Sequence, residues 1–172
     1  KTFNLVATFV TDVANVGSNE PGTPEEVLSR FGNIVPKARK LLEVPKAWRR
    51  WVLGDREPIE NWTDGKVTLL GDGAHPTHQY FAQGACMALE DAVCLGAEFE
   101  RHGGDFEAAF QAYQAARIPR AYRVVLSSRE LGRVYHAQGV ERLIRNQWLG
   151  SKSPTQFYDS LEWLYGGTGL KA

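Results

Sequence analysis

Residues 67–93 (VTLLGDGAHPTHQYFAQGACMALEDAV) contain most of the side chains whose types and spacing could do chemistry. Asp72 lies just past the carboxyl end of residues 67–70, which we expect to form a short buried strand. Ligands of open α/β sheets bind beyond the carboxyl ends of strands, so a ligand hydroxyl could hold this carboxylate. A backbone N–H or an arginine could also hold it, because a buried carboxylate without partners is very costly. The residues alone do not choose between the two.

The second notable feature is the start of the helix expected over residues 84–101, where Gly84 is followed by Ala85 and Cys86. A helix start carries unpaired N–H groups and a partial positive charge. Small residues leave those groups within reach of a flat ligand, so an anionic or electron-rich ring edge could dock there. A tightly packed helix start without a ligand is the competing interpretation.

Other kinds of chemistry find little support. His75 and His78 are three positions apart, but Pro76 between them opposes the regular helical spacing of a metal site. No Gly-x-Ser-x-Gly nucleophile motif occurs, and neither cysteine has an evident histidine partner. The GGTG sequence at 166–169 lacks the following lysine and helix of a phosphate-binding loop. Because His75 and His78 lack the regular helical spacing, we predict no metal site.

The bulk composition restricts the partners. Among the 172 residues, 20 Lys and Arg balance 20 Asp and Glu, so net charge gives no case for nucleic-acid or membrane-surface binding. No apolar run approaches the ~18 residues that cross a bilayer. Cys86 and Cys94 fall about 12 Å apart on one expected helix, too far for a disulfide. We expect both to be small core residues in a reducing compartment, and the protein to be cytoplasmic.

Local patterns predict the elements that position these residues. Apolar and polar residues alternate over 1–10, as in a strand. Because a strand needs neighbours, we expect the chain to be a piece of a longer protein whose N-terminal half is missing here. Thr23 and Pro24 are typical of a helix start. The expected strands are 1–10, 47–58 and 66–70, and the expected helices are 24–42 with an interruption at Pro36, 84–101, 106–136, 140–149 and 154–164.

Two of the expected helices carry further predictions. The helix over 84–101 is apolar on almost every side, so we expect all its faces to be covered. Pro119 should kink the helix over 106–136 or split it in two. We expect Glu90 and Asp91 to pair with arginines or cap neighbouring helices, and Arg117 and Arg120 to make structural contacts.

Residues 67–93 as a whole resemble the second FAD-binding motif of the single-component FAD-dependent aromatic hydroxylases. That motif runs from a strand through Gly-Asp and an Ala-Ala-His-Pro-like turn to a Gly-Gln-Gly-like helix start and a Glu-Asp-Ala helix. WVLGDREPIENWTDGKV (51–67) and YQAARIPRAYRVVLSSR (113–129) are similar to further segments of these enzymes. DSLEWLYGGTGL (159–170) is similar to the C-terminal end of 3-hydroxybenzoate 6-hydroxylases and their salicylate-hydroxylase-like relatives.

The resemblance implies roles for individual residues. Asp72 is similar to the aspartate that hydrogen-bonds the ribityl chain of FAD. The backbone N–H groups near Gly84, Ala85 and Cys86 match those that face the pyrimidine edge of the flavin. The implied cofactor-binding residues are Gly71, Asp72, Pro76, Gly84, Ala85 and Cys86. The implied catalytic residues, on the loop that lines the ring and the substrate, are Gln79 and Tyr80.

The same resemblance implies an enzyme that reduces FAD with NADH or NADPH and transfers one oxygen atom of O2 to a phenolic aromatic acid. Conversion of 3-hydroxybenzoate to gentisate is the first expectation, and salicylate or a hydroxynicotinate is the next. The competing hypothesis is a non-catalytic helical interaction module derived from such an enzyme. The long C-terminal helices could serve as the face of a homodimer.

The implied fold is α/β, present here as an α+β fragment. It is the helix-rich C-terminal part of a Rossmann-like FAD- and NAD(P)-binding hydroxylase, with strands from the substrate sheet. We expect 1–62 to belong to the substrate-binding sheet, 63–100 to return to the FAD-binding domain, and 101–172 to form a C-terminal helical layer.

The chain also departs from the family pattern. Gly73 stands where the family usually has alanine, and Ala82 stands where a glycine often begins the Gly-Gln-Gly sequence. The Gly-x-Gly-x-x-Gly unit that holds the FAD pyrophosphate does not occur in these residues, so they could not bind FAD tightly alone. No catalytic base is assigned, because the residues near the end of the first expected strand are Val10, Thr11 and Asp12, where several relatives carry a histidine.

Overall fold

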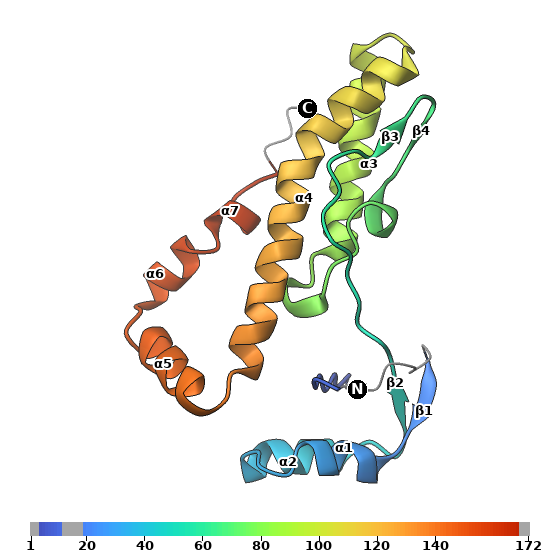
Figure 1. Cartoon of the computed structure of the whole chain (residues 1–172). Coiled ribbons are helices and arrows are strands. Elements are labelled where there is room, and N and C mark those ends of the chain that lie inside the picture. Colours follow the sequence, from blue (N-terminus) through green and yellow to red (C-terminus); the bar gives the residue numbers. More distant parts are fainter. Residues whose placement is uncertain (1–3, 12–18, 169–172) are drawn as a thin grey trace. The chain divides into compact units, whose positions relative to one another are not determined.

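A computed structural model describes residues 4–11 and 19–168 of the chain (Figure 1). It divides into two compact units, residues 1–53 and residues 54–172, and each is described by itself. Every residue predicted to bind a cofactor or substrate belongs to the second unit.

The first unit contains a two-stranded antiparallel sheet and two short helices. Strand β1 (Glu20–Gly22) pairs with β2 (Trp48–Arg50), and helices α1 (Pro24–Arg30) and α2 (Pro36–Leu42) lie between them in sequence. The predicted helix start is confirmed, since the Thr23 hydroxyl accepts a hydrogen bond from the Glu26 N–H at 3.1 Å. Pro36 separates the helices, because proline favours the first helical turn and opposes helical conformation in the residue before it.

Two strand predictions in the first unit were wrong. Residues 4–10 form no strand, and residues 1–3 of that expected element lie outside the described residues. Residues 4–10 belong to neither of the two described sheets, and Val6 and Val10 are 63% and 76% exposed. Without a neighbouring strand the backbone has no ladder to join, whatever its alternation of side chains. The strand expected over 47–58 is restricted to the three residues of β2, which are those paired with β1.

The second unit begins with a small hairpin. Strand β3 (Thr63–Asp64) pairs antiparallel with β4 (Val67–Thr68), and Gly65 takes the positive φ of 51° that the tight turn requires. The expected strand over 66–70 is therefore shorter than predicted. It is also not buried, because the Val67 side chain is 67% exposed. Two short 3-10 helices follow, η1 (Gly71–Gly73) and η2 (Gln79–Phe81).

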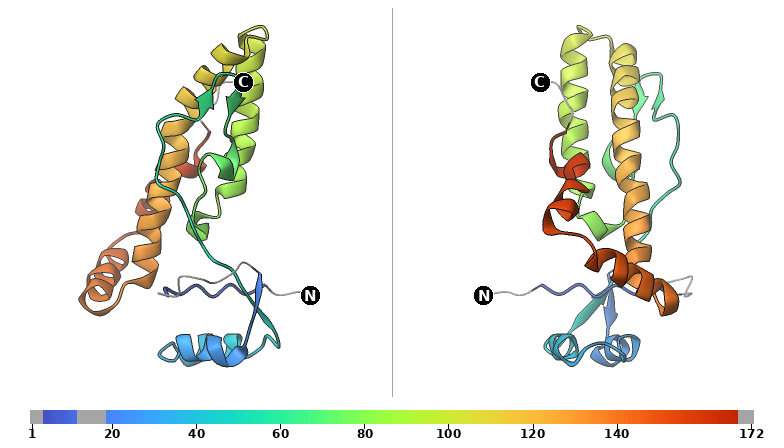
Figure 2. Two further views of the ribbon diagram at one scale, coloured as in Figure 1. Left: turned by 45° about the vertical axis from the view of Figure 1, so that its right-hand side comes forward. Right: turned by 90° about the vertical axis from the view of Figure 1, so that its left-hand side faces the viewer.

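Two long antiparallel helices form the body of the second unit. Helices α3 (Gly84–Arg101) and α4 (Phe106–His136) lie side by side in both views of Figure 2 and have the predicted bounds. The Asp105 side chain caps α4 by accepting from the Ala108 N–H at 3.1 Å. Between and beside these helices lies a core of buried residues: Trp62, Ala74, Cys94, Tyr113, Ala121, Tyr122 and Val125.

Pro119 does not split α4 in two, so that alternative of the prediction was wrong, and the kink stays a prediction. The helix is continuous over 31 residues with the proline inside it. A helix-interior proline costs about 3 kcal/mol. Arg117 and Ala121 on either side of it are fully buried, and this packing holds the helical path through the missing backbone hydrogen bond.

The remaining helices are short: α5 (Gly139–Gly150), α6 (Pro154–Asp159) and α7 (Glu162–Tyr165). The single helix expected over 154–164 is thus two helices, separated at Ser160 and Leu161. Leu164 on α7 is buried with Met87 and Val124 in a second core cluster. No helix in the described part of the chain combines the length and apolarity needed for a bilayer crossing.

One face of α3 is uncovered in this chain, contrary to the prediction. Leu89 and Val93, one turn apart, are 68% and 62% exposed, and Ala85 and Cys86 are exposed as well. Cys94 is a core residue as expected, and burial raises the pKa of its thiol. Cys86 is not, because it lies on the uncovered face while Cys94 faces α4.

Candidate functional site

The turn that carries Asp72 is built around a buried carboxylate on α3. Oδ2 of Asp91 accepts a hydrogen bond from the Gly71 N–H at 3.0 Å and lies 2.6 Å from Nε2 of His75. Oδ1 of Asp91 accepts from Nε of Arg117 at 2.7 Å. His75, Asp91 and Arg117 are almost completely buried. The network therefore fixes both ends of the segment from Gly71 to His75 from its inner side.

Electrostatics keep this buried carboxylate ionised. Burial by itself would raise the pKa of Asp91, but the hydrogen bonds from His75, Arg117 and the Gly71 N–H outweigh that effect and lower it. Burial also opposes ionisation of Glu90, where hydrogen bonds from Arg120 and Arg117 lower the pKa. The expectation that Glu90 and Asp91 pair with arginines is confirmed.

Two features favour glycine at position 71. Its φ is 57°, a conformation that other residues adopt only with strain, and an added Cβ would lie 3.2 Å from Cβ of Ala88 on α3. This close approach of turn and helix places Asp72 beside the beginning of α3.

The Asp72 side chain is directed to the start of α3 and stays exposed. Its Oδ1 lies 4.0 Å from the position that a Cβ on Gly84 would take. Within the described ranges no hydrogen bond or ion pair holds the carboxylate. The sequence left two kinds of partner open for Asp72, a ligand hydroxyl or a protein donor. The described residues provide neither an arginine nor a backbone N–H for this carboxylate.

The start of α3 has the open character predicted for it. Gln83 occupies the N-cap position without a side-chain cap, and Ala85 and Cys86 in the first turn are exposed. An added Cβ on Gly84 would meet only ordinary contacts, 3.6 Å to Cγ2 of Thr77 and 4.0 Å to Asp72. The described chain therefore does not itself require glycine at this position. The absence of a side chain fits a planar group lying against the backbone, such as a flavin.

The loop between the turn and α3 is attached to α4. The Ser128 hydroxyl donates to the His78 carbonyl at 2.9 Å. The Tyr80 ring packs on Gly132, where an added Cβ would lie only 2.5 Å from its Cε2. Tyr135 and His136 complete the surroundings, with ring centroids 5.7 and 5.9 Å from that of Tyr80. Burial raises the pKa of the Tyr80 phenol.

The other two predicted loop residues lie on the same segment. Gln79 is exposed at the beginning of η2, and Pro76 is half-buried between the turn and the loop. Ala82 ends η2 with a φ of 55°, in the left-handed region.

Of the predicted site residues, the structure brings Gly71, Asp72 and Gly84 together. Tyr80 is turned toward α4.

Three residues that shape this site were not predicted from the sequence in these roles: His75, which bonds Asp91, Ser128, which holds the His78 carbonyl, and Gly132, on which Tyr80 packs. Only Gly132 offered a signal, since a glycine inside a long helix commonly marks a close approach. The His75 ring is hydrogen-bonded to Asp91. No cluster of three metal-binding side chains occurs in residues 4–11 and 19–168.

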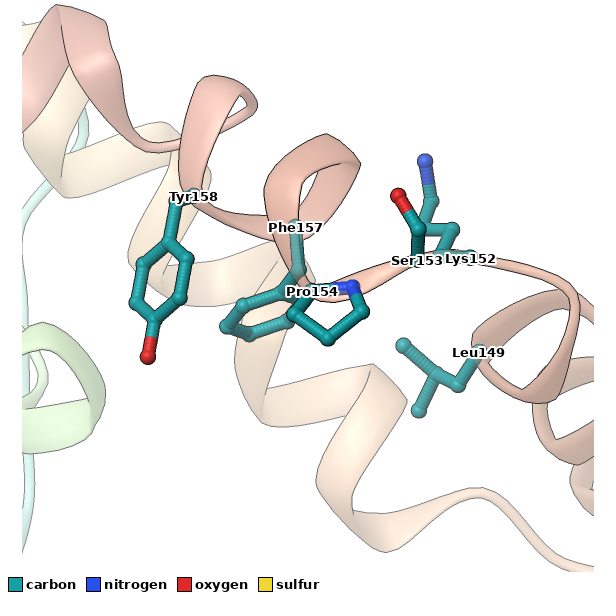
Figure 3. Close-up of a pocket in the computed structure, with 6 residues that line it drawn as sticks. All are labelled: Leu149, Lys152, Ser153, Pro154, Phe157 and Tyr158. Carbon is teal, nitrogen blue, oxygen red and sulfur yellow. The ribbon is translucent and has the colours of Figure 1, made fainter.

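A separate surface hollow of about 380 Å³ lies between α5 and α6 (Figure 3). Its lining contains none of the predicted site residues and consists of Leu149, Lys152, Ser153, Pro154, Phe157 and Tyr158. Ser153 caps α6 there, which explains its presence structurally.

Solved structures with this arrangement are flavoprotein hydroxylases. A salicylate hydroxylase in complex with its substrate matches with a TM-score of 0.73 and 29% identity, over 92% of this chain and 38% of its own. HpxO from Klebsiella pneumoniae, complexed with FAD and uric acid, matches with a TM-score of 0.71 and 30% identity, over 80% of this chain and 36% of its own. The resemblance to FAD-dependent aromatic hydroxylases and the helix-rich fold of a part of them are confirmed.

Sequence comparison narrows the resemblance. A 3-hydroxybenzoate 6-hydroxylase from Polaromonas naphthalenivorans (strain CJ2) is 54% identical over 164 residues, which are 95% of this chain and 41% of that enzyme. The chain therefore spans about two fifths of the length of this relative. No family model matches the chain.

Proposed function

We propose that the full-length polypeptide is an FAD-dependent monooxygenase that hydroxylates a phenolic aromatic acid with NAD(P)H and O2. The favoured reaction converts 3-hydroxybenzoate to gentisate, and salicylate or a hydroxynicotinate is the next choice. The observation that carries the proposal is the Asp72 carboxylate, exposed and without a protein partner in the described chain, beside an uncapped helix start. The names of the relatives support the choice of reaction.

Each predicted cofactor residue then has a physical task. Asp72 accepts a hydrogen bond from a ribityl hydroxyl of FAD, an interaction worth about 1.5–3 kcal/mol. The N–H groups of Gly84, Ala85 and Cys86 donate toward the electron-rich edge of the ring, where the helix dipole favours negative charge. Gly71 permits the turn. FAD, when bound, supplies the redox and oxygen-transfer chemistry.

The loop residues act on the substrate side. Gln79 is exposed at the beginning of η2, and a neutral amide can hold a phenol oxygen without competing for its charge. Pro76 lines the ring with backbone that has no N–H to satisfy. Tyr80, fixed on Gly132, keeps the loop in place and excludes water from the site.

Replacement of the Asp72 carboxylate tests the proposal. The purified full-length protein should be yellow and should oxidise NAD(P)H faster when 3-hydroxybenzoate is added. Asp72→Ala should weaken FAD binding by about 10- to 150-fold, which corresponds to the loss of a charge-assisted hydrogen bond. Asp159→Ala, at an exposed carboxylate on α6, is the matched control and should bind FAD normally. Normal flavin retention and turnover in the Asp72 variant would refute the proposal.

The quaternary structure and the cellular location are further proposals. We propose a homodimer that uses the C-terminal helices and works in the reducing cytoplasm. Light scattering of the purified full-length protein tests the first, and fractionation of cells that express it tests the second.

A further inference from the structure

A second support of the Asp72 turn is an arginine that is distant in sequence. Nη2 of Arg56 donates to the carbonyl of Gly73 at 2.6 Å and to the carbonyl of Ala74 at 2.8 Å. The Tyr122 hydroxyl also donates to the Ala74 carbonyl, at 3.1 Å. These carbonyls belong to the two residues that follow Asp72 directly. Their position therefore sets the direction of the Asp72 backbone and of its carboxylate.

The backbone of Arg56 is itself held in place by α4. Nη2 of Arg129 on α4 donates to the Arg56 carbonyl at 3.0 Å, and the same guanidinium pairs with the carboxylates of Asp55 and Glu57. The hydrogen bonds with Asp55 and then Glu57 raise the pKa of Arg129, so it stays charged. Segment 55–57 is thereby attached to α4, and the Arg56 guanidinium extends from it to the turn.

The two supports of the turn come from different segments of the chain. Asp91 on α3 holds the Gly71 N–H and the His75 ring, while Arg56 holds the carbonyls of Gly73 and Ala74, the second together with Tyr122. Arg56 is exposed, so its removal opens no cavity and leaves no buried charge. The loss of Arg56 should therefore leave the turn attached but free to shift on the side where Asp72 projects.

We infer that Arg56 is a positioning residue for FAD binding. Its guanidinium, clamped by Arg129, holds the carbonyls of Gly73 and Ala74 so that the Asp72 carboxylate faces the start of α3. This inference rests on the proposed role of Asp72. It assigns no direct contact between Arg56 and the cofactor.

Titration of FAD into the full-length apoprotein, followed by flavin fluorescence and visible circular dichroism, tests the inference. Arg56→Ala should weaken FAD binding by about 5- to 30-fold, as expected from the loss of two hydrogen bonds to the turn. It should also alter the circular dichroism of the bound flavin. Arg56→Lys, which retains a donor, should recover part of the affinity, and Arg129→Ala should weaken binding by a smaller factor. Arg142→Ala, at an exposed arginine on α5, is the control and should change nothing.

A double-mutant cycle separates positioning from direct contact. If Arg56 acts through Asp72, then Arg56→Ala should change affinity less than twofold in an Asp72→Ala background. An undiminished effect in that background would mean that Arg56 touches the cofactor itself, and would overturn the inference. Unchanged affinity in Arg56→Ala and Arg56→Lys would overturn it too.

The cycle also separates this inference from the proposed function. If Asp72→Ala weakens FAD binding and the Arg56 variants do not, only the positioning role fails. If Asp72→Ala itself has no effect, the proposed role of Asp72 fails, and the inference fails with it.

Discussion

Nε2 of His75 and Oδ2 of Asp91 lie 2.6 Å apart in the interior, although sixteen positions separate them along the chain. The same Oδ2 holds the Gly71 N–H, so one carboxylate on α3 ties down the turn that presents Asp72. Because Arg117 neutralises this carboxylate from α4, the turn, α3 and α4 are joined at one point.

Loss of the Asp91 charge should strongly destabilise the full-length protein. In Asp91→Asn the Arg117 guanidinium loses the buried one of its two carboxylate partners, and His75 loses its charged partner. Removal of one member of a buried pair costs about 3–5 kcal/mol. Chemical denaturation at a fixed FAD concentration measures the change, with Glu100→Gln at an exposed position on α3 as the control. A loss below 1 kcal/mol would show that the network contributes little.

The lowered pKa of Asp91 predicts a specific acid dependence. The stability that it supplies is fully present above its unfolded pKa of 3.8 and is lost as pH falls through the lower folded pKa. The stability difference between the unmodified protein and Asp91→Asn should therefore be constant above about pH 5 and shrink below about pH 4. Urea denaturation from pH 7 to pH 3 measures it. Parallel curves over the whole range would contradict the prediction.

Gly84→Ala should separate cofactor binding from protein packing. The described chain has room for the added methyl, and alanine favours a helix by up to about 1 kcal/mol, so stability should not fall. A methyl between the backbone and a docked ring should cost about 1–3 kcal/mol of FAD binding free energy. Thermal unfolding of the apoprotein and FAD titration give the two values. Gly150→Ala, where an added Cβ meets nothing, should leave FAD affinity unchanged. Unaltered FAD binding by Gly84→Ala would favour a plain helix start.

Gly132→Ala should displace the Tyr80 ring. The added Cβ would lie 2.5 Å from Cε2 of Tyr80, and such overpacking costs about 1–3 kcal/mol of stability. In a Tyr80→Ala background the clash is gone, so the same change should be neutral or stabilising. Thermal unfolding of the four proteins of this cycle measures the coupling. If the two changes in melting temperature are additive, the Tyr80 ring does not pack on Gly132 in solution.

Ala82→Gly should stabilise the protein. Ala82 has a φ of 55°, and the left-handed conformation costs a residue with a side chain about 1–2 kcal/mol. Glycine avoids this strain but loses more backbone entropy on folding, so the expected net gain is up to about 1 kcal/mol. Ala92→Gly, inside α3, should instead lower the melting temperature. A lower melting temperature for Ala82→Gly would show that the loop relaxes this strain in solution.

Local signals explain why much of the fold was predictable. The bounds of α3 and α4 agree with local signals in the sequence, Gly103 and Gly104 after the first helix and Asp105 as the cap of the second. Capping and turn chemistry act within a few residues, so they are visible in the sequence. The resemblance of residues 67–93 assigned Asp72 and Gly84 to one cofactor site, and Oδ1 of Asp72 lies 4.0 Å from the position of a Cβ on Gly84.

Contacts between distant residues were decided by the tertiary structure alone. The sequence did not indicate that α4 would run unbroken through Pro119, that residues 4–10 would form no strand, or that Arg56 would hold the carbonyls of Gly73 and Ala74. Each outcome depends on which residues, distant in sequence, lie close enough in the folded chain to satisfy a hydrogen bond or bury a surface. The sequence by itself determined the chemistry available at the turn and helix start. The packing of α3 against α4 decided which of these groups are held in place by the protein and which, like the Asp72 carboxylate, are left exposed.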